Sequence, residues 1–197
     1  MSQASSSNSP DMAARLAAAA AKVAPTVLVL MGVSGSGKST VAQELQRLLG
    51  WPFQEGDDLH PPANVEKMRS GRPLDDTDRQ PWLEAIARWL DGQLAARQPG
   101  IITCSNLKRA YRRITIGDRQ GATLVYLKGD RSEIEQRVQK RTHRYMPSSL
   151  LGSQFDALEE PGPDEHPITV SVSGTVAKTV LNVLEQLAGR DEQLPNR

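Results

Sequence analysis

A glycine-rich segment directly after a short apolar run constrains the fold of this chain more than any other feature. The apolar run is 26–31 (Thr-Val-Leu-Val-Leu-Met), and the segment 32–39 reads Gly-Val-Ser-Gly-Ser-Gly-Lys-Ser. The segment matches G-x-x-x-x-G-K-[ST] in full, and an amphipathic stretch with Val41, Leu45 and Leu48 follows it. Because the run lacks alternation, it is typical of a strand buried on both faces of a parallel sheet. This order predicts a phosphate-binding loop (P-loop) between a strand and a helix.

The residue types in this loop fit the binding of a nucleotide triphosphate. Glycines let consecutive backbone N–H groups turn toward phosphate oxygens, and the helix N-terminus adds partial positive charge. Lys38 can reach the β- and γ-phosphates, and the Ser39 hydroxyl can bind Mg²⁺. A glycine turn without a ligand is the alternative, which the strand and helix on either side disfavour. The predicted nucleotide contacts are Gly32, Val33, Ser34, Gly35, Ser36, Gly37, Lys38, Ser39 and Thr40.

Further apolar runs alternate with amphipathic stretches along the rest of the chain. The runs are 51–55, 101–104, 123–127 and 168–172. Strands that alternate with helices predict an α/β, three-layer fold of the P-loop NTPase type, with a parallel sheet covered by helices on both faces. Thr77 and Gln80 predict a capping box at the start of one of these helices.

We expect one domain of the P-loop type over 25–190 with mobile inserts. The segment of about 58–80 is rich in Pro, Gly and charge and is long enough to be a substrate-binding insert, and a polar loop covers about 141–150. Residues 1–24 are read as a disordered or weakly helical tail, and 191–197 as a flexible tail.

Bulk composition excludes several classes of protein. The formal net charge is +1 and aromatic residues are 4% of the chain, so nothing indicates binding to nucleic acid or to a membrane surface. No apolar run is long enough to cross a bilayer. The single cysteine, Cys104, cannot form an internal disulfide, which suits a reducing compartment. We therefore expect a cytoplasmic protein.

The P-loop alone does not separate an enzyme from a nucleotide switch. The chain lacks the Asn-Lys-x-Asp segment by which GTPases read guanine, and the run 101–104 ends without an aspartate for Mg²⁺. The nearest replacement is Glu55-Gly56-Asp57, where the second strand should end. Glu55 could bind Mg²⁺, and Asp57 could orient a substrate hydroxyl or accept its proton. A solvated acidic turn is an equally simple reading of the same residues.

Histidine and basic residues near these carboxylates have two readings each. His60 lies beside prolines and could contact substrate or simply pack. Arg79 could bind an anionic substrate or solvate the insert, and so could Lys108 and Arg112. Arg137 and Arg141 are four residues apart on one predicted helix face, from which they could close over a triphosphate.

Taken together, these segments resemble the gluconate kinases, a branch near the shikimate and adenylate kinases. The most specific matches are 55–61 (Glu-Gly-Asp-Asp-Leu-His-Pro), 71–83, which contains Asp-Arg-Gln-Pro-Trp-Leu, and 146–155, which contains Ser-Gln-Phe. The other matching segments are 31–40, 64–68, 107–112 and 125–130. They follow the family's order from residue 31 almost to the C-terminus.

The resemblance implies transfer of the ATP γ-phosphoryl group to the 6-hydroxyl of D-gluconate, with Mg²⁺. It implies a five-stranded parallel sheet, a mobile lid and a homodimer. It favours Lys38, Asp57 and Arg141 as catalytic residues, and Arg137 with Arg141 as phosphate clamps. The implied substrate contacts are Asp57, His60, Arg79, Lys108 and Arg112.

The chain also departs from the family pattern. Asn106 stands where the family has alanine, Arg113 where it has an acidic residue, and His143-Arg144 where it has Gly-His. Two rival readings remain: a kinase for another sugar acid or shikimate-like polyol acid, and a nucleotide-dependent regulator without catalysis.

Overall fold

The computed structural model describes residues 10–139 and 149–191. Its centre is a sheet of five parallel strands in the order β2-β3-β1-β4-β5. The strands are β1 (Val27–Met31), β2 (Phe53–Gln54), β3 (Gly100–Thr103), β4 (Ala122–Lys128) and β5 (Ile168–Ser171). Each lies within two residues of an apolar run in the sequence, so the predicted five-stranded parallel sheet is confirmed.

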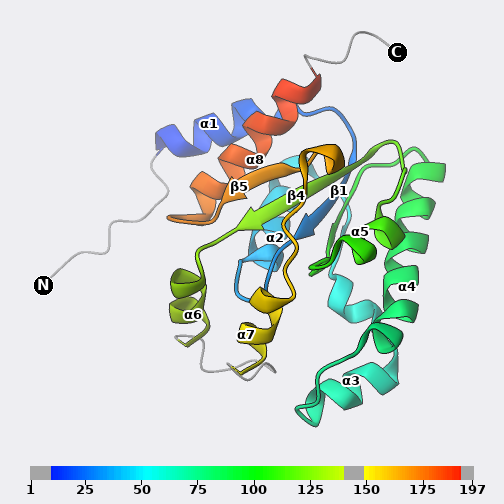
Figure 1. Ribbon diagram of the computed structural model, residues 1–197. Coiled ribbons are helices and arrows are strands. Elements are labelled where there is room, and N and C mark those ends of the chain that lie inside the picture. Colours follow the sequence, from blue (N-terminus) through cyan, green and yellow to red (C-terminus); the bar gives the residue numbers. More distant parts are fainter. Residues whose placement is uncertain (1–9, 140–148, 192–197) are drawn as a thin grey trace, which may run out of the picture.

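Helices cover both faces of this sheet (Figure 1). The helices are α1 (Pro10–Ala20), α2 (Lys38–Leu49), α3 (Pro62–Arg69), α4 (Asp76–Ala95), α5 (Arg109–Thr115), α6 (Arg131–Gln139), α7 (Ser149–Asp156) and α8 (Val176–Asp191), with short 3₁₀ turns η1 (Gly56–Leu59) and η2 (Pro163–Glu165). Leu28 and Leu30 of β1 pack with α1, α2 and α8, whereas Val27 and Val29 pack with α4 and Tyr111 of α5. This alternation follows from the opposite directions of successive side chains along a strand, and it confirms the three-layer α/β prediction.

The N-terminal segment contains a helix that packs on the core. Residues 10–20, expected to belong to a disordered or weakly helical tail, form α1. Leu16 and Ala19 of this helix are buried in the core beside α8, and Arg15 lies 3.5 Å from Glu185. The sequence indicated helical character here but not where the helix packs, because its partner α8 lies near the other end of the chain.

The N-terminus of α4 differs from its prediction as well. Asp75, not Thr77, is the N-cap residue, and it forms a capping box with Asp78. The Asp78 N–H donates to Asp75 Oδ1 at 2.9 Å, and the Asp75 N–H donates to Asp78 Oδ2 at 2.9 Å. Aspartate is as good an N-cap as serine or threonine, so sequence preference alone does not choose among neighbouring candidates.

The carboxyl ends of the strands lie together at one edge of the sheet. The P-loop follows β1, η1 follows β2, and the loop to α5 follows β3. In Figure 1 this edge faces α6 and α7 on one side and α3 on the other. Ligands of open α/β sheets bind at this edge. Among the described helices, none has both the length and the apolar character needed to cross a lipid bilayer.

Candidate active site

The P-loop is held in shape by hydrogen bonds to its own backbone. Lys38 Nζ donates to the carbonyl oxygens of Gly32 at 2.9 Å and Val33 at 3.2 Å. The Ser36 N–H donates to the Val33 carbonyl at 3.2 Å. Burial lowers the pKa of the Lys38 amine, and the negative charge of Asp57 is the largest influence in the opposite direction. The lysine therefore lies inside the loop, in reach of any phosphate that the loop binds.

The glycine at position 35 makes room for a neighbouring helix. Its φ is +83°, in the left-handed region, and a Cβ atom would lie 2.5 Å from Val138 Cγ2 and 3.2 Å from Ile134 Cγ2. A side chain at Gly35 would therefore push α6 away from the loop.

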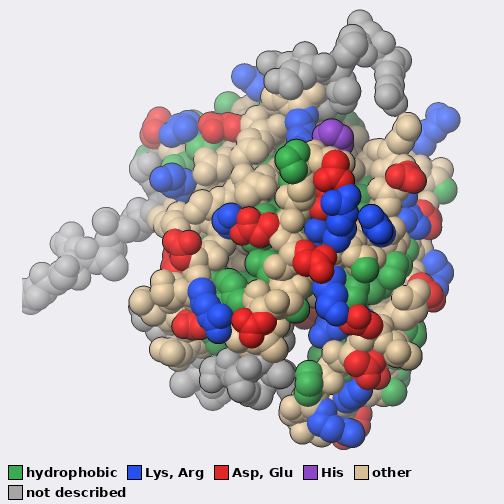
Figure 2. All heavy atoms as spheres, viewed as in Figure 1, with side chains coloured by type: hydrophobic (Ala, Val, Ile, Leu, Met, Phe, Trp, Pro, Cys, Tyr) green, Lys and Arg blue, Asp and Glu red, His purple; other side chains and the backbone are tan. Residues whose placement is uncertain are grey.

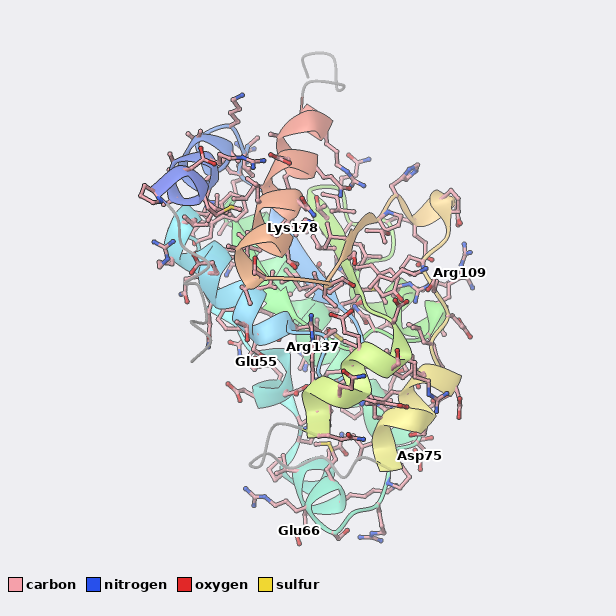
Figure 3. All side chains as sticks on the ribbon, turned by 90° about the vertical axis from the view of Figure 1, so that its left-hand side faces the viewer. Glu55, Glu66, Asp75, Arg109, Arg137 and Lys178 are labelled. Atoms are coloured by element: carbon pink, nitrogen blue, oxygen red, sulfur yellow. The ribbon has the colours of Figure 1, made fainter. Side chains whose placement is uncertain are left out.

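A pocket of about 360 Å³ adjoins the P-loop on the side of α8. Its wall includes Arg137, whose Nη2 donates to the Val172 carbonyl at 2.5 Å and to Glu133 Oε1 at 2.6 Å. Figure 3 shows the Arg137 side chain reaching from α6 toward the loop before α8. The lining residues are Gly35, Ser36, Gly37, Thr40, Val41, Arg137, Val172, Gly174, Val176 and Thr179.

Sequence reasoning missed half of this pocket. It singled out Arg137 and the P-loop, but not the segment from Val172 to Thr179, which contains the loop between β5 and α8 and the first turn of α8. The glycine at 174, just after a predicted strand, was the available signal, because the carboxyl end of each strand in a parallel sheet faces the same edge.

The predicted acidic turn is built on a hydrogen-bonded connection between β2 and β3. The Gly56 N–H donates to Thr103 Oγ1 at 3.0 Å, and the Thr103 hydroxyl donates to a carboxylate oxygen of Glu55. A Cβ atom on Gly56 would lie 1.9 Å from the Thr103 carbonyl oxygen, so only glycine fits there. Trp82 Nε1 donates to the Gly56 carbonyl at 2.7 Å. Glu55 is thus held in place and is not a freely solvated acid.

Asp57 and Arg79 share an electrostatic environment with the P-loop lysine. Burial raises the pKa of the Cys104 thiol to about 12, and charges on Asp57, Lys38 and Arg79 also act on that thiol. Asp57 and Glu55 both favour the charged form of Lys38. The fold therefore brings together residues that lie far apart in the sequence.

His60 is held by an aromatic ring and an amide. Its imidazole stacks on the Trp82 indole, with ring centroids 4.3 Å apart and planes at 12°. Asn64 Nδ2 lies 3.5 Å from His60 Nδ1 and donates to the Asp78 carbonyl at 2.6 Å. Burial, with a smaller contribution from Arg79, lowers the pKa of His60 to about 4. The imidazole is therefore neutral at pH 7.

Lys108 and Arg79 surround the ring of Tyr111. Lys108 Nζ donates to both carboxylate oxygens of Asp76, at 2.8 and 2.9 Å, and the Tyr111 hydroxyl donates to the same carboxylate. Lys108 Nζ lies 5.3 Å and Arg79 Cζ 5.9 Å from the Tyr111 ring centroid. Two cations against one carboxylate leave a local excess of positive charge, which suits an anionic ligand.

Arg112 has a different environment from the one expected of a substrate contact. Its side chain is 2% exposed, and Nε and Nη2 donate to the two carboxylate oxygens of Glu165 at 2.6 and 2.8 Å. Nη1 donates to the carbonyls of Glu159 at 2.8 Å and Asn106 at 3.1 Å. Because these partners occupy the guanidinium, we remove Arg112 from the candidate substrate contacts and assign it to the attachment of η2 to α5.

Asn106, a departure from the family pattern, has a conformational explanation. Its φ is +45°, in the left-handed region, which asparagine adopts more readily than alanine. Its Oδ1 accepts a hydrogen bond from the Thr115 hydroxyl at 3.2 Å. The substitution therefore fits the turn that leads to Lys108.

Arg141, predicted to be catalytic and to clamp phosphate, lies outside the described residues. So does most of the predicted lid of about 141–150, of which the structure describes only the first residues of α7.

Arg113, the second departure from the family pattern, is exposed at the surface of α5. Figure 2 shows acidic and basic side chains interleaved over the α5 side of the molecule, so no large patch of one sign appears on this face.

Residues of the site fit ATP and Mg²⁺. The Ser36 hydroxyl is buried without a hydrogen-bond partner among the described residues, and it lines the pocket beside the P-loop. The described residues contain no cluster of three or more His, Cys, Asp or Glu side chains that could hold a metal alone. Mg²⁺ that is bound to a nucleotide takes few protein ligands, and the Ser39 hydroxyl and the Glu55 carboxylate are oxygen ligands of the kind that it prefers.

Comparison with known proteins agrees with this geometry. Residues 27–161 match the family model described as an AAA domain. A gluconokinase from Gluconobacter oxydans is 52% identical over 147 residues, which cover 75% of this chain and 83% of the relative. The thermoresistant gluconokinase of Escherichia coli is 42% identical and covers 78% of this chain and 91% of its own length.

Solved structures give the same result. The crystal structure of a gluconokinase from Sinorhizobium meliloti superposes with a TM-score of 0.77 at 43% identity, over 86% of this chain and 95% of that one. Shikimate kinase from Aquifex aeolicus, at 18% identity and a TM-score of 0.53, shares the fold alone. With sequence matches of this identity over most of both chains, this protein belongs to the gluconokinase family.

Proposed function

We propose that this protein transfers the γ-phosphoryl group of ATP to the 6-hydroxyl of D-gluconate, which yields ADP and 6-phosphogluconate. One observation carries the proposal: Asp57 lies within electrostatic reach of Lys38, while Arg79 and Lys108 lie together around Tyr111. Gluconate has its reacting hydroxyl and its carboxylate at opposite ends. A site for it needs an acid beside the P-loop and cations farther away.

At the nucleotide end, the P-loop N–H groups bind the β- and γ-phosphates and the adjoining pocket receives the adenosine. Lys38 exchanges its carbonyl partners for phosphate oxygens and stabilises charge that develops on the transferred group. Arg137 borders the nucleotide from α6.

At the reacting centre, Asp57 orients the 6-hydroxyl and accepts its proton. Ser39 and Glu55 would hold Mg²⁺, and the hydrogen bond from Thr103 fixes the direction of the Glu55 carboxylate. When bound, Mg²⁺ neutralises charge on the β- and γ-phosphate oxygens.

At the gluconate end, Arg79 and Lys108 bind the substrate carboxylate. Asp76 is the counterion of Lys108 in the described structure. The substrate carboxylate therefore displaces the Asp76 carboxylate from Lys108 or binds beside it. His60, neutral and held by Trp82, donates a hydrogen bond to a substrate hydroxyl through Nε2–H if Asn64 donates to its Nδ1.

Location and assembly are part of the proposal. A reaction that consumes ATP suits the cytoplasm. The buried free thiol of Cys104 suits the same reducing compartment. There the product would feed the catabolism of sugar acids. The homodimer expected from the family resemblance is checked by light scattering of the purified protein.

The deciding experiment is a coupled ADP-release assay with a panel of sugar acids and shikimate, with and without Mg²⁺. We expect the highest kcat/KM for D-gluconate and no turnover without Mg²⁺. Another acid turned over at least tenfold better would replace the substrate assignment. ATP binding without turnover of any acid would favour the nucleotide-dependent regulator.

A further inference from the structure

We propose that Gln154 of α7 is a positioning residue for phosphoryl transfer, because it holds the first half of the P-loop when Lys38 turns to the triphosphate. This inference rests on the proposed kinase function. Its starting point is one contact: the backbone N–H of Ser34 donates to Gln154 Oε1 at 2.7 Å. The two residues lie 120 positions apart in the chain.

Two side chains fix residues 32–34 in the described structure. Lys38 binds the carbonyls of Gly32 and Val33, and Gln154 binds the N–H of Ser34. The Lys38 ammonium has three donors and two of them bind these carbonyls, so contact with more than one phosphate oxygen must replace or weaken a carbonyl bond. Among the described side chains, only Gln154 then continues to hold this half of the loop independently of Lys38.

Gln154 approaches the loop from a helix that is itself fixed. Leu151 of α7 is 3% exposed within the core, and the Phe155 ring lies 5.6 Å from the guanidinium carbon of Arg131 on α6. Arg131 Nη1 also lies 3.5 Å from Asp156 Oδ1. Because α7 is anchored on both sides of Gln154, the amide oxygen is held at a defined place before nucleotide binds, which reduces the entropy lost in ordering the loop.

The chemistry of the amide matters as well as its position. Ser34 donates to an uncharged acceptor, so the contact adds no negative charge beside a triphosphate. A carboxylate in the same place would accept the same N–H but would repel the phosphates. Glutamine and glutamate at position 154 should therefore hold the ligand-free loop equally well. The glutamate should weaken nucleotide binding, and the glutamine should not.

The test uses the full-length protein with Gln154→Met, Gln154→Glu and the control Asp156→Asn. Methionine keeps the length of the side chain but removes the acceptor and the amide N–H donors, whereas glutamate removes only the donors and keeps an acceptor. Asp156→Asn weakens the contact of the same helix with Arg131 and leaves the P-loop untouched. Steady-state kinetics with both substrates, binding of ATP and ADP by calorimetry without gluconate, and thermal melting of the ligand-free protein are measured for each.

For Gln154→Met we expect kcat/KM for ATP to fall about tenfold, as for the loss of one well-placed hydrogen bond, with KM for gluconate unchanged. For Gln154→Glu we expect a melting temperature at or above that of Gln154→Met but weaker ATP binding, partly recovered at high salt. Asp156→Asn should keep wild-type kinetics.

If Gln154→Met and Asp156→Asn lose activity equally, Gln154 serves only to dock α7 and the proposal is overturned. A kcat/KM for Gln154→Met within twofold of the wild-type value would also overturn it. The binding data do not need turnover. If the protein fails to phosphorylate gluconate, a loss of ATP affinity in Gln154→Met but not in Asp156→Asn still supports the role of Gln154.

Discussion

The imidazole of His60 and the indole of Trp82 stack almost in parallel, and the same indole donates a hydrogen bond to the Gly56 carbonyl. Trp82 thus connects a candidate substrate contact with the turn that carries Glu55 and Asp57. A change at Trp82 should therefore affect both His60 and the turn that carries Asp57.

The first prediction concerns His60 and pH. Its pKa is about 4 in the folded protein, below the usual value of about 6.5 that applies to the unfolded chain. Between these values the unfolded state binds the proton and the folded state does not, so His60 should make the free energy of unfolding fall as the pH falls from about 6.5 to 4. His60→Gln should flatten this dependence in denaturant titrations.

A matched control is His166→Asn, which removes an exposed histidine at a left-handed position that asparagine tolerates. It should leave the slope over the same pH range closer to wild type than His60→Gln does. The prediction is wrong if both variants change the slope equally.

The second prediction concerns Gly56. A Cβ atom would lie 1.9 Å from the Thr103 carbonyl, so Gly56→Ala must displace β2 from β3 or move the acidic turn. We expect a loss of more than about 4 kcal/mol in the free energy of unfolding, or a protein that does not fold.

Gly92→Ala is the control for this substitution. Gly92 lies inside α4 with no atom within 4 Å of the added methyl group, so the change should stabilise the protein by up to about 1 kcal/mol. Thermal melting of both variants decides the matter, and near-equal melting temperatures would disprove the proposed clash.

The third prediction separates chemistry from folding. Lys38→Ala should lower kcat by roughly 10²–10³, since it removes charge that stabilises the transition state. Asp57→Asn keeps the shape of the side chain but removes the proton acceptor, so kcat should fall by roughly 10²–10⁴. Both should melt near the wild-type temperature. A near wild-type kcat for Asp57→Asn would move that residue out of the active site.

The fourth prediction concerns the buried pair Arg112–Glu165. Arg112→Met leaves the Glu165 carboxylate without its partner and should cost about 3–5 kcal/mol of unfolding free energy. Glu165→Gln should destabilise the protein in the same direction, while KM for gluconate stays at the wild-type value in both. A rise of KM in Arg112→Met but not in Glu165→Gln would return Arg112 to the substrate contacts.

The sequence by itself determined the order of strands and helices along the chain and the identity of the phosphate-binding loop. Buried strands and amphipathic helices have short local periods, and the P-loop is a contiguous motif whose glycines and lysine act on neighbouring atoms. For these features local pattern and final position coincide, so β1, the loop and α2 were predicted within a residue or two.

Only the tertiary structure decided which basic residues are available to a ligand. Arg79, Lys108 and Arg112 look alike in sequence, yet Arg112 is buried against Glu165, 53 positions away, while Lys108 pairs with an exposed Asp76. The Gln154–Ser34 contact and the pocket loop at Gly174 are of the same kind. Such partners are set by how strands order themselves in the sheet and how helices pack on it, and no short-range pattern in the chain records that choice.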